Sequence, residues 1–142
     1  MTRLLDVNVL VALAWPNHMH HGRALKWFSS IDEKGWATCP VTESGFVRVS
    51  SNVRVIPDAR TPGQAIELLR QIRDLPGHCF WSDDVSPADP DAPAFERVVG
   101  YRQVIDAHLL TLAIQNGGRL ATFDRGVAEL LPGTPDAVEL IP

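Results

Sequence analysis

The stretch RLLDVNVLVALAW, residues 3–15, decides how the rest of the chain is interpreted. It is almost entirely apolar, yet it carries the acid Asp6 and the amide Asn8. A buried ionised carboxylate is costly unless it is paired, hydrogen-bonded or bound to a metal. We therefore expect a short strand over residues 3–6 that leaves the core at Asp6. A largely buried helix over residues 8–15 follows, and a proline stops it.

The remainder of the chain repeats this alternation of short apolar strands and helical segments. Such alternation is typical of βαβ units and a parallel sheet, and it predicts the α/β class. Thr42 and Thr61 are expected to cap two of the helices, and Pro62 fits the first position of the second one. SPADPDAP, residues 86–93, is expected to be an exposed and mobile loop. Further strands are expected in WATC (36–39), HCFW (78–81), RLATF (119–123) and AVELI (137–141), and further helices over 21–30, 43–50, 61–74 and 103–116.

Length and composition are those of a globular protein. The 142 residues suit a single domain spanning 1–142, with 45% hydrophobic and 21% charged residues. No apolar run reaches the roughly 20 residues that span a bilayer, and no cleavage pattern marks a signal peptide. We therefore expect a cytoplasmic protein with no membrane partner, in which both cysteines are free buried thiols. The net charge of −4 does not exclude a nucleic-acid partner. If four of the acidic residues belong to a metal site, the acidic and basic residues on the rest of the surface are equal in number.

Four acidic residues fall where strands are expected to end. Asp6 ends the first strand, Glu43 lies just past the second, and Asp124 lies just past the fourth. Asp106 lies in the first turns of the helix that leads into the fourth strand. Sites in open parallel sheets form in the crevice outside the carboxyl ends of the strands. We therefore expect these four carboxylates to converge there.

Converging carboxylates repel one another, so they need a counter-cation. All-oxygen ligand sets suit Mg²⁺ or Mn²⁺ rather than zinc, and one or two such ions are expected. Divalent ions held in this way activate water and stabilise leaving oxygens at phosphodiesters. Asn8 and Thr122 are expected at most to orient a carboxylate or a water in this site.

Each residue also has an ordinary structural explanation. Asp6 and Asp124 could be helix N-caps, and Glu43 could complement a helix dipole. The cluster of His18, His20 and His21 is interpreted as a solvated helix start rather than a zinc site, because its spacing is wrong for zinc. His108 is not expected to be a ligand, and Trp15, Trp27 and Trp36 are expected in the core or an interface.

The segments LLDVNVLVAL, TESGFVRV, VIDAHLLTLA and LATFDRG, in this order, resemble the PIN-domain family. Within it, the chain is similar to the VapC-type toxin ribonucleases. The resemblance implies a three-layer α/β/α sandwich around a short, mainly parallel sheet, with an acidic pocket for Mg²⁺ or Mn²⁺. It also implies endonucleolytic cleavage of RNA, inhibition by a cognate antitoxin and a homodimer. Asp6 and Asp106 match the direct metal ligands, whereas Glu43 and Asp124 match acids that act through water.

Three alternatives remain on the sequence alone. A phosphatase of the haloacid dehalogenase type needs a second Asp where this chain has Asn8. A phosphate-accepting receiver module needs an acid after the third strand, where Asp83 and Asp84 lie, and a lysine near the fifth strand, where there is none. A non-catalytic binding module would not need the complete set of acids.

Overall fold

The computed structural model describes residues 1–31 and 35–142, and in these the chain forms a three-layer α/β/α sandwich. The central sheet has the strand order β3-β2-β1-β4-β5, and every neighbouring pair is parallel. The predicted fold class is therefore confirmed. The strands of the described residues are β1 (Arg3–Leu5), β2 (Trp36–Thr38), β3 (His78–Phe80), β4 (Arg119–Thr122) and β5 (Val138–Leu140).

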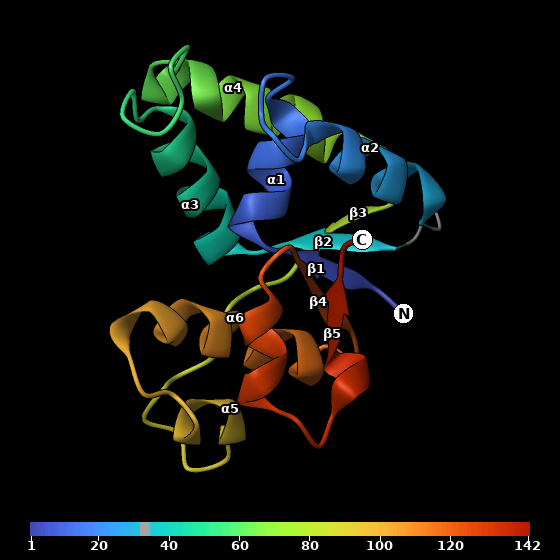
Figure 1. Ribbon diagram of the computed structural model, residues 1–142, viewed down its shortest axis with the longest axis vertical. Coiled ribbons are helices and arrows are strands. Elements are labelled where there is room, and N and C mark those ends of the chain that lie inside the picture. Colours follow the sequence, from blue (N-terminus) through green and yellow to red (C-terminus); the bar gives the residue numbers. More distant parts are fainter. Residues whose placement is uncertain (32–34) are drawn as a thin grey trace.

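Helices cover both faces of this sheet (Figure 1). One face carries α1 (Val7–Ala14), α2 (His21–Ser30), α3 (Pro40–Ser50) and α4 (Pro62–Arg73), and the other carries α5 (Pro93–Glu96) and α6 (Val104–Gln115). Because the strands are parallel, their carboxyl ends meet at one edge, and the segments after β1 and β4 lie there as neighbours.

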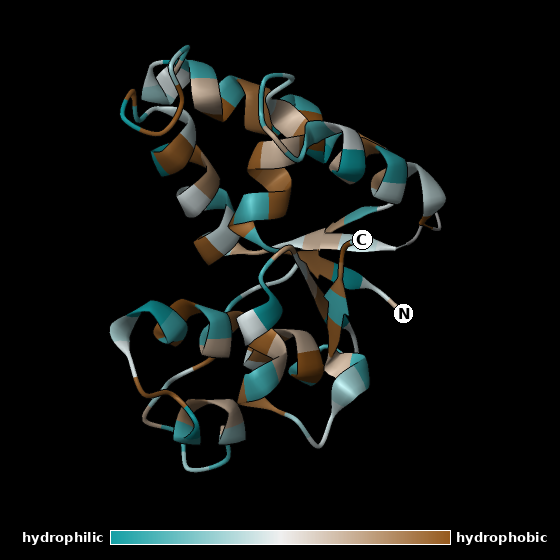
Figure 2. Ribbon diagram, viewed as in Figure 1, coloured by the Kyte–Doolittle hydropathy of each residue, from teal (hydrophilic) through white to brown (hydrophobic). Residues whose placement is uncertain are grey.

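The core is divided between the two faces of the sheet because side chains of a strand alternate in direction. Leu4 of β1 packs with Leu109 and Leu120 on the α6 side, whereas Leu5 packs with Leu10 and Phe46 on the α1 side. All six side chains are fully buried. Each contributes about 1.5–3 kcal/mol by its transfer from water. Figure 2 shows the hydrophobic colouring that α1 carries over most of its length, as expected for a helix inside the sandwich.

The start of α3 differs from the sequence prediction. Thr42 is not the N-cap; Cys39 holds that position and Pro40 is the first helical residue. Proline is favoured there because its missing N–H would have no partner in any case. Thr42 instead reaches back and accepts a hydrogen bond from the Cys39 N–H. The cap predicted at Thr61 is confirmed.

Two further segments refine the prediction. The helix α1 begins at Val7, one residue earlier than expected, with Asp6 as its N-cap. The helix α5 was not predicted, since its first residue, Pro93, ends the segment that was interpreted as a loop. The helix α6 ends at Gln115, and Gly117, just past its C-cap Asn116, has a φ of +69°, the left-handed conformation that glycine adopts without strain.

A glycine lets α1 and α3 approach closely beside Asp6. A Cβ atom built on Gly45 of α3 would lie 2.6 Å from Cγ2 of Val7, the first residue of α1. The entrance of α1, and with it the Asp6 side chain, is therefore fixed against α3. No helix within the described residues is long and apolar enough to cross a membrane.

Candidate functional site: an acidic pocket at the sheet edge

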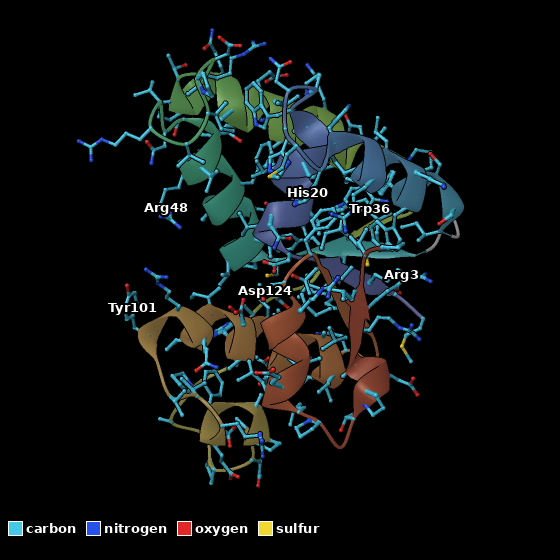
Figure 3. All side chains as sticks on the ribbon, viewed as in Figure 1. Arg3, His20, Trp36, Arg48, Tyr101 and Asp124 are labelled. Atoms are coloured by element: carbon cyan, nitrogen blue, oxygen red, sulfur yellow. The ribbon has the colours of Figure 1, made fainter. Side chains whose placement is uncertain are left out.

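A pocket of about 410 Å³ opens at the carboxyl edge of the sheet. Three of the four predicted acids, Asp6, Asp106 and Asp124, line it together with Asn8. Asp6 follows β1, Asp124 follows β4, and Asp106 comes from the first turn of α6. In Figure 3, Asp124 lies where the helical layers on either side of the sheet meet. The remaining wall consists of Val7, Val11, His18, Val49, Val55 and Ile56.

Asp6 is held in one orientation by a backbone N–H and a side-chain hydroxyl. Only 7% of its surface is exposed. Its Oδ1 accepts a hydrogen bond from the Val7 N–H at 2.7 Å, and its Oδ2 accepts one from the Thr122 hydroxyl at 2.8 Å. Burial raises the pKa of Asp6, these two hydrogen bonds oppose that rise, and the charge of Asp124 adds to it. Asp6 is thus both the predicted helix cap and part of the pocket.

The hydroxyl of Thr122, at the end of β4, connects three of the pocket residues. It donates to Asp6 and accepts a hydrogen bond from the Asp124 N–H at 3.1 Å and from the Asn8 amide at 3.4 Å. Asn8 in turn accepts from the Phe123 N–H at 3.5 Å. Thr122 itself is fully buried. Thr122 therefore contacts both Asp6 and Asp124, whereas Asn8 contacts Thr122 and the backbone of Phe123.

The ionisation of Asp106 is also disfavoured in the pocket. It is half-buried, and its pKa is raised to about 6. Burial is the main cause, and the negative charges of Asp6 and Asp124 add to it. The three carboxylates are therefore close enough to oppose one another's ionisation.

Glu43 is not brought into this pocket. Its Oε1 accepts a hydrogen bond from the Thr38 hydroxyl at 2.7 Å, and its Oε2 faces the Arg73 guanidinium at 3.4 Å. Because the Thr38 proton is directed to Glu43, the ring Nε2 of His78, 2.7 Å from Thr38, is the donor in that contact. Glu43 instead lines a neighbouring pocket that also contains Arg48.

The histidine cluster is more closely packed than the expected solvated helix start. His18 lines the acidic pocket, and burial, followed by the charges of His20 and His21, lowers its pKa. His20 stacks on the ring of Phe123 at 4.8 Å, and His21 Nδ1 lies 2.7 Å from a carbonyl oxygen of α1. Sequence reasoning missed His18 as a pocket residue, and only its position in the turn before α2 could have indicated it.

Other residues that the alternative interpretations of the sequence involve lie outside the acidic pocket. The Nε2 atom of His108 lies 2.7 Å from Oδ2 of Asp83, and neither residue lines the acidic pocket. Trp15, Trp27 and Trp36 are buried, as predicted.

The acidic pocket fits a hard divalent cation in the type of donor it offers. Within the described residues, Asp6, Asp106 and Asp124 make no ion pair, so their mutual repulsion has no protein counter-charge. In the same residues no three acidic, histidine or cysteine side chains form a ready-made metal cage. Mg²⁺ does not require one, since it keeps several waters and binds through one or two carboxylates plus substrate phosphates.

Comparison with known proteins agrees with this geometry. The profile of the PIN domain matches residues 3–130. The chain belongs to the PIN-domain family. Among the relatives of this PIN-domain chain is Ribonuclease VapC38 of Mycobacterium tuberculosis, which is 55% identical over 141 residues, covering 97% of this chain and 96% of that protein. Ribonuclease VapC39 of the same organism is 50% identical, covering 91% and 93% of the two chains. Ribonuclease VapC44 is 42% identical, covering 98% and 96%.

Proposed function

We propose that this PIN-domain chain is the toxin of a toxin–antitoxin pair and that it cleaves RNA endonucleolytically with Mg²⁺ or Mn²⁺. The observation that carries the proposal is the convergence of Asp6, Asp106 and Asp124 on one pocket. It occurs in a chain that is 55% identical to a protein named as a ribonuclease. The whole chain, residues 1–142, is proposed to act as a single nuclease domain.

In this proposal Asp6, Asp106 and Asp124 hold one or two divalent ions. When bound, such an ion activates water for attack on a phosphodiester and neutralises charge on the phosphate. Asp6 contributes a carboxylate whose orientation is set by Val7 N–H and Thr122 before any ligand arrives. Such preorganisation spares the reaction the cost of turning the group into place.

Glu43 takes a different part in the proposal from the other acids. Its carboxylate is engaged by Thr38 and Arg73 and lines the adjacent pocket. We therefore assign it a contact through water with the metal site, rather than direct ligation.

The substrate strand is proposed to reach the site along the side where Arg48 and Tyr101 project. Figure 3 shows Arg48 extending from α3 and Tyr101 from the turn before α6, on the same side of the molecule. Arg48 is exposed and Tyr101 is 81% exposed. A guanidinium suits phosphate oxygens, and an exposed ring suits an unstacked base.

The proposal extends to partners and compartment. A cognate antitoxin would inhibit the nuclease, a homodimer would be its assembly, and the cytoplasm, where RNA is translated, would be its place of action. The likeness to the VapC proteins supports all three as parts of the proposal.

The test is cleavage of purified total RNA by antitoxin-free protein with Mg²⁺ or Mn²⁺, run beside EDTA and an Asp6→Asn variant. Asparagine is as good an N-cap as aspartate, so the variant keeps the start of α1 while it loses the carboxylate. An exposed carboxylate outside the pocket, Asp91, gives the matched control Asp91→Asn. We expect discrete fragments from the wild type and the control, and at least a hundredfold less from Asp6→Asn or in EDTA. Cleavage that persists in EDTA or in Asp6→Asn would refute the proposed site.

A further inference from the structure

A second cavity, of about 180 Å³, adjoins the acidic pocket. It is enclosed by the turn after α1, residues 15–18, and by residues 55–58 of the connection between α3 and α4. The two cavities have a common wall made of His18, Val55 and Ile56. An apolar cavity of about 150 Å³ accommodates benzene, so this one has room for an aromatic ring.

The walls of this cavity are apolar and preformed. Trp15, Pro16, Ile56 and Pro57 line it, and of these Trp15 and Ile56 are buried. The indole of Trp15 is fixed, because its Nε1–H donates to the Ser50 hydroxyl at 3.1 Å. A rigid aromatic wall of this kind binds flat ring systems at little entropic cost.

The rim of the cavity is polar. Asn17 and Asp58 line it and are exposed. Asp58 makes no side-chain hydrogen bond or ion pair with any part of the chain that the structure describes, so its carboxylate is available as an acceptor. Two arginines flank it on the same connection: Arg54 is exposed, and the guanidinium of Arg60 lies 5.7 Å from the centre of the Trp15 ring.

We propose that this cavity binds a nucleobase of the RNA strand, adjacent to the phosphate that is cleaved. The inference rests on the proposed ribonuclease function and adds a source of sequence preference to it. A strand with a phosphate at Asp6 and Asp106 passes the common wall, so the base of a neighbouring nucleotide lies at the mouth of the cavity. RNA-binding proteins recognise such unstacked bases by stacking on aromatic side chains and by hydrogen bonds to the base edge.

The polar groups at the rim of the cavity restrict which bases it can bind. A carboxylate accepts a hydrogen bond from an exocyclic amino group, as acidic side chains do with cytosine. Asp58 therefore favours cytosine, adenine or guanine, which carry an exocyclic amino group, over uracil, whose one edge donor is the ring N3–H. Arg54 and Arg60 supply the positive charge that holds the backbone phosphates nearby. An apolar side chain of a protein partner would fit the walls too, but it would leave these arginines and the Asp58 carboxylate without a partner.

The first test fills the cavity with a larger side chain and leaves the carboxylates of the acidic pocket unchanged. In Val55→Trp, a large side chain replaces a residue of the common wall that is 58% exposed, so the fold tolerates it. The matched control is Val53→Trp, on the same connection, 72% exposed and lining neither cavity. Sequencing of the cleaved RNA ends measures base preference at each position around the cut. We expect Val55→Trp to lose at least tenfold of the preference at one adjacent position and Val53→Trp to match the wild type. Asp58→Asn is expected to change which bases are accepted at that same position.

A second measurement does not depend on catalysis. In EDTA, the indole N–H signal of ¹⁵N-labelled Trp15 is followed by NMR while cytidine, adenosine, guanosine or uridine monophosphate is added. The first three are expected to shift it more than uridine monophosphate or ribose 5-phosphate, and Val55→Trp is expected to abolish the shift. If the wild type does not cleave RNA yet these shifts occur, the proposed function fails while the base site stands.

Three outcomes would overturn the base site itself. One is an unshifted Trp15 signal, or a shift that ribose 5-phosphate produces equally. Another is an unchanged base preference in Val55→Trp. The last is a Val55→Trp protein that keeps its base preference but escapes inhibition by the antitoxin, which would assign the cavity to a protein side chain.

Discussion

Replacing Asp106 by asparagine is expected to stabilise the metal-free protein at neutral pH. Burial, and then the charges of Asp6 and Asp124, raise the pKa of Asp106 from 3.8 to about 6. Its ionisation at pH 7.5 therefore opposes folding. A shift of roughly two pKa units corresponds to about 3 kcal/mol. Because the side chain is half-exposed, solvent screening reduces the expected gain in the free energy of unfolding to about 1–2 kcal/mol.

The gain has a defined pH dependence. The folded-state pKa of Asp106 is raised, so the stability associated with its protonated form is complete below about pH 3.8 and is lost as the pH rises through about 6. The wild type should accordingly gain stability from this group as the pH falls from 7.5 toward 4. Asp106→Asn has no such group, so its advantage should be largest above pH 6 and should disappear toward pH 4.

Urea unfolding followed by tryptophan fluorescence, in EDTA at pH 7.5 and at pH 4.5, measures both quantities. Asp91→Asn serves as the control, because Asp91 is exposed and lies outside the acidic pocket. Excess Mg²⁺ or Mn²⁺ should reverse the ranking at pH 7.5, since ligand binding stabilises only the protein that retains its ligand. The reasoning is refuted if Asp106→Asn is no more stable than the wild type at pH 7.5, or if its advantage is the same at both pH values.

Other predictions test the supports of the site. Thr122→Val removes the hydroxyl that donates to buried Asp6, so the free energy of unfolding measured in urea should fall by about 1–3 kcal/mol and kcat for RNA cleavage should fall as well. An unaltered free energy of unfolding would argue against this hydrogen bond. Gly45→Ala places a methyl group against Val7, so the free energy of unfolding should fall by about 1–3 kcal/mol, and a neutral result would show that α1 can move away from α3. Arg48→Ala should weaken RNA binding equally for all sequences and reduce the slope of log affinity against log salt by about 1, whereas an unchanged slope would exclude a phosphate contact.

The parts of the fold and site that are encoded locally were predictable from the sequence. The ends of β1 and β4 are visible in the chain, so Asp6 and Asp124 could be placed at the carboxyl edge of the sheet. The direction of the Glu43 side chain is different, because Arg73, which lies on α4, helps to determine it. The N-cap at Cys39 was missed because both Thr42 and Pro40 signal a helix start, and the proline takes precedence.

The walls of the two cavities could not be predicted from the sequence, because they too depend on contacts between segments that are distant in the chain. Residues 15–18 and 55–58 belong to irregular connections, which have no periodic pattern. They come together only because α1 and α3 pack against each other, and no single segment of the sequence records that packing.

The division of the acidic pocket between segments that follow β1 and β4 sets the order in which the pocket can form during synthesis. Asp6 and its hydrogen-bond donor Thr122 are 116 residues apart in the sequence. At about 5–20 residues per second, a ribosome needs roughly 6–23 s to reach the second after the first. Until β4 has emerged and paired with β1, Asp6 has neither Thr122 nor Asp124 beside it. A nascent chain therefore carries no assembled acidic pocket until the segment from β4 to Asp124 has been made, and the RNA of the ribosome that makes it is not exposed to a finished site before then.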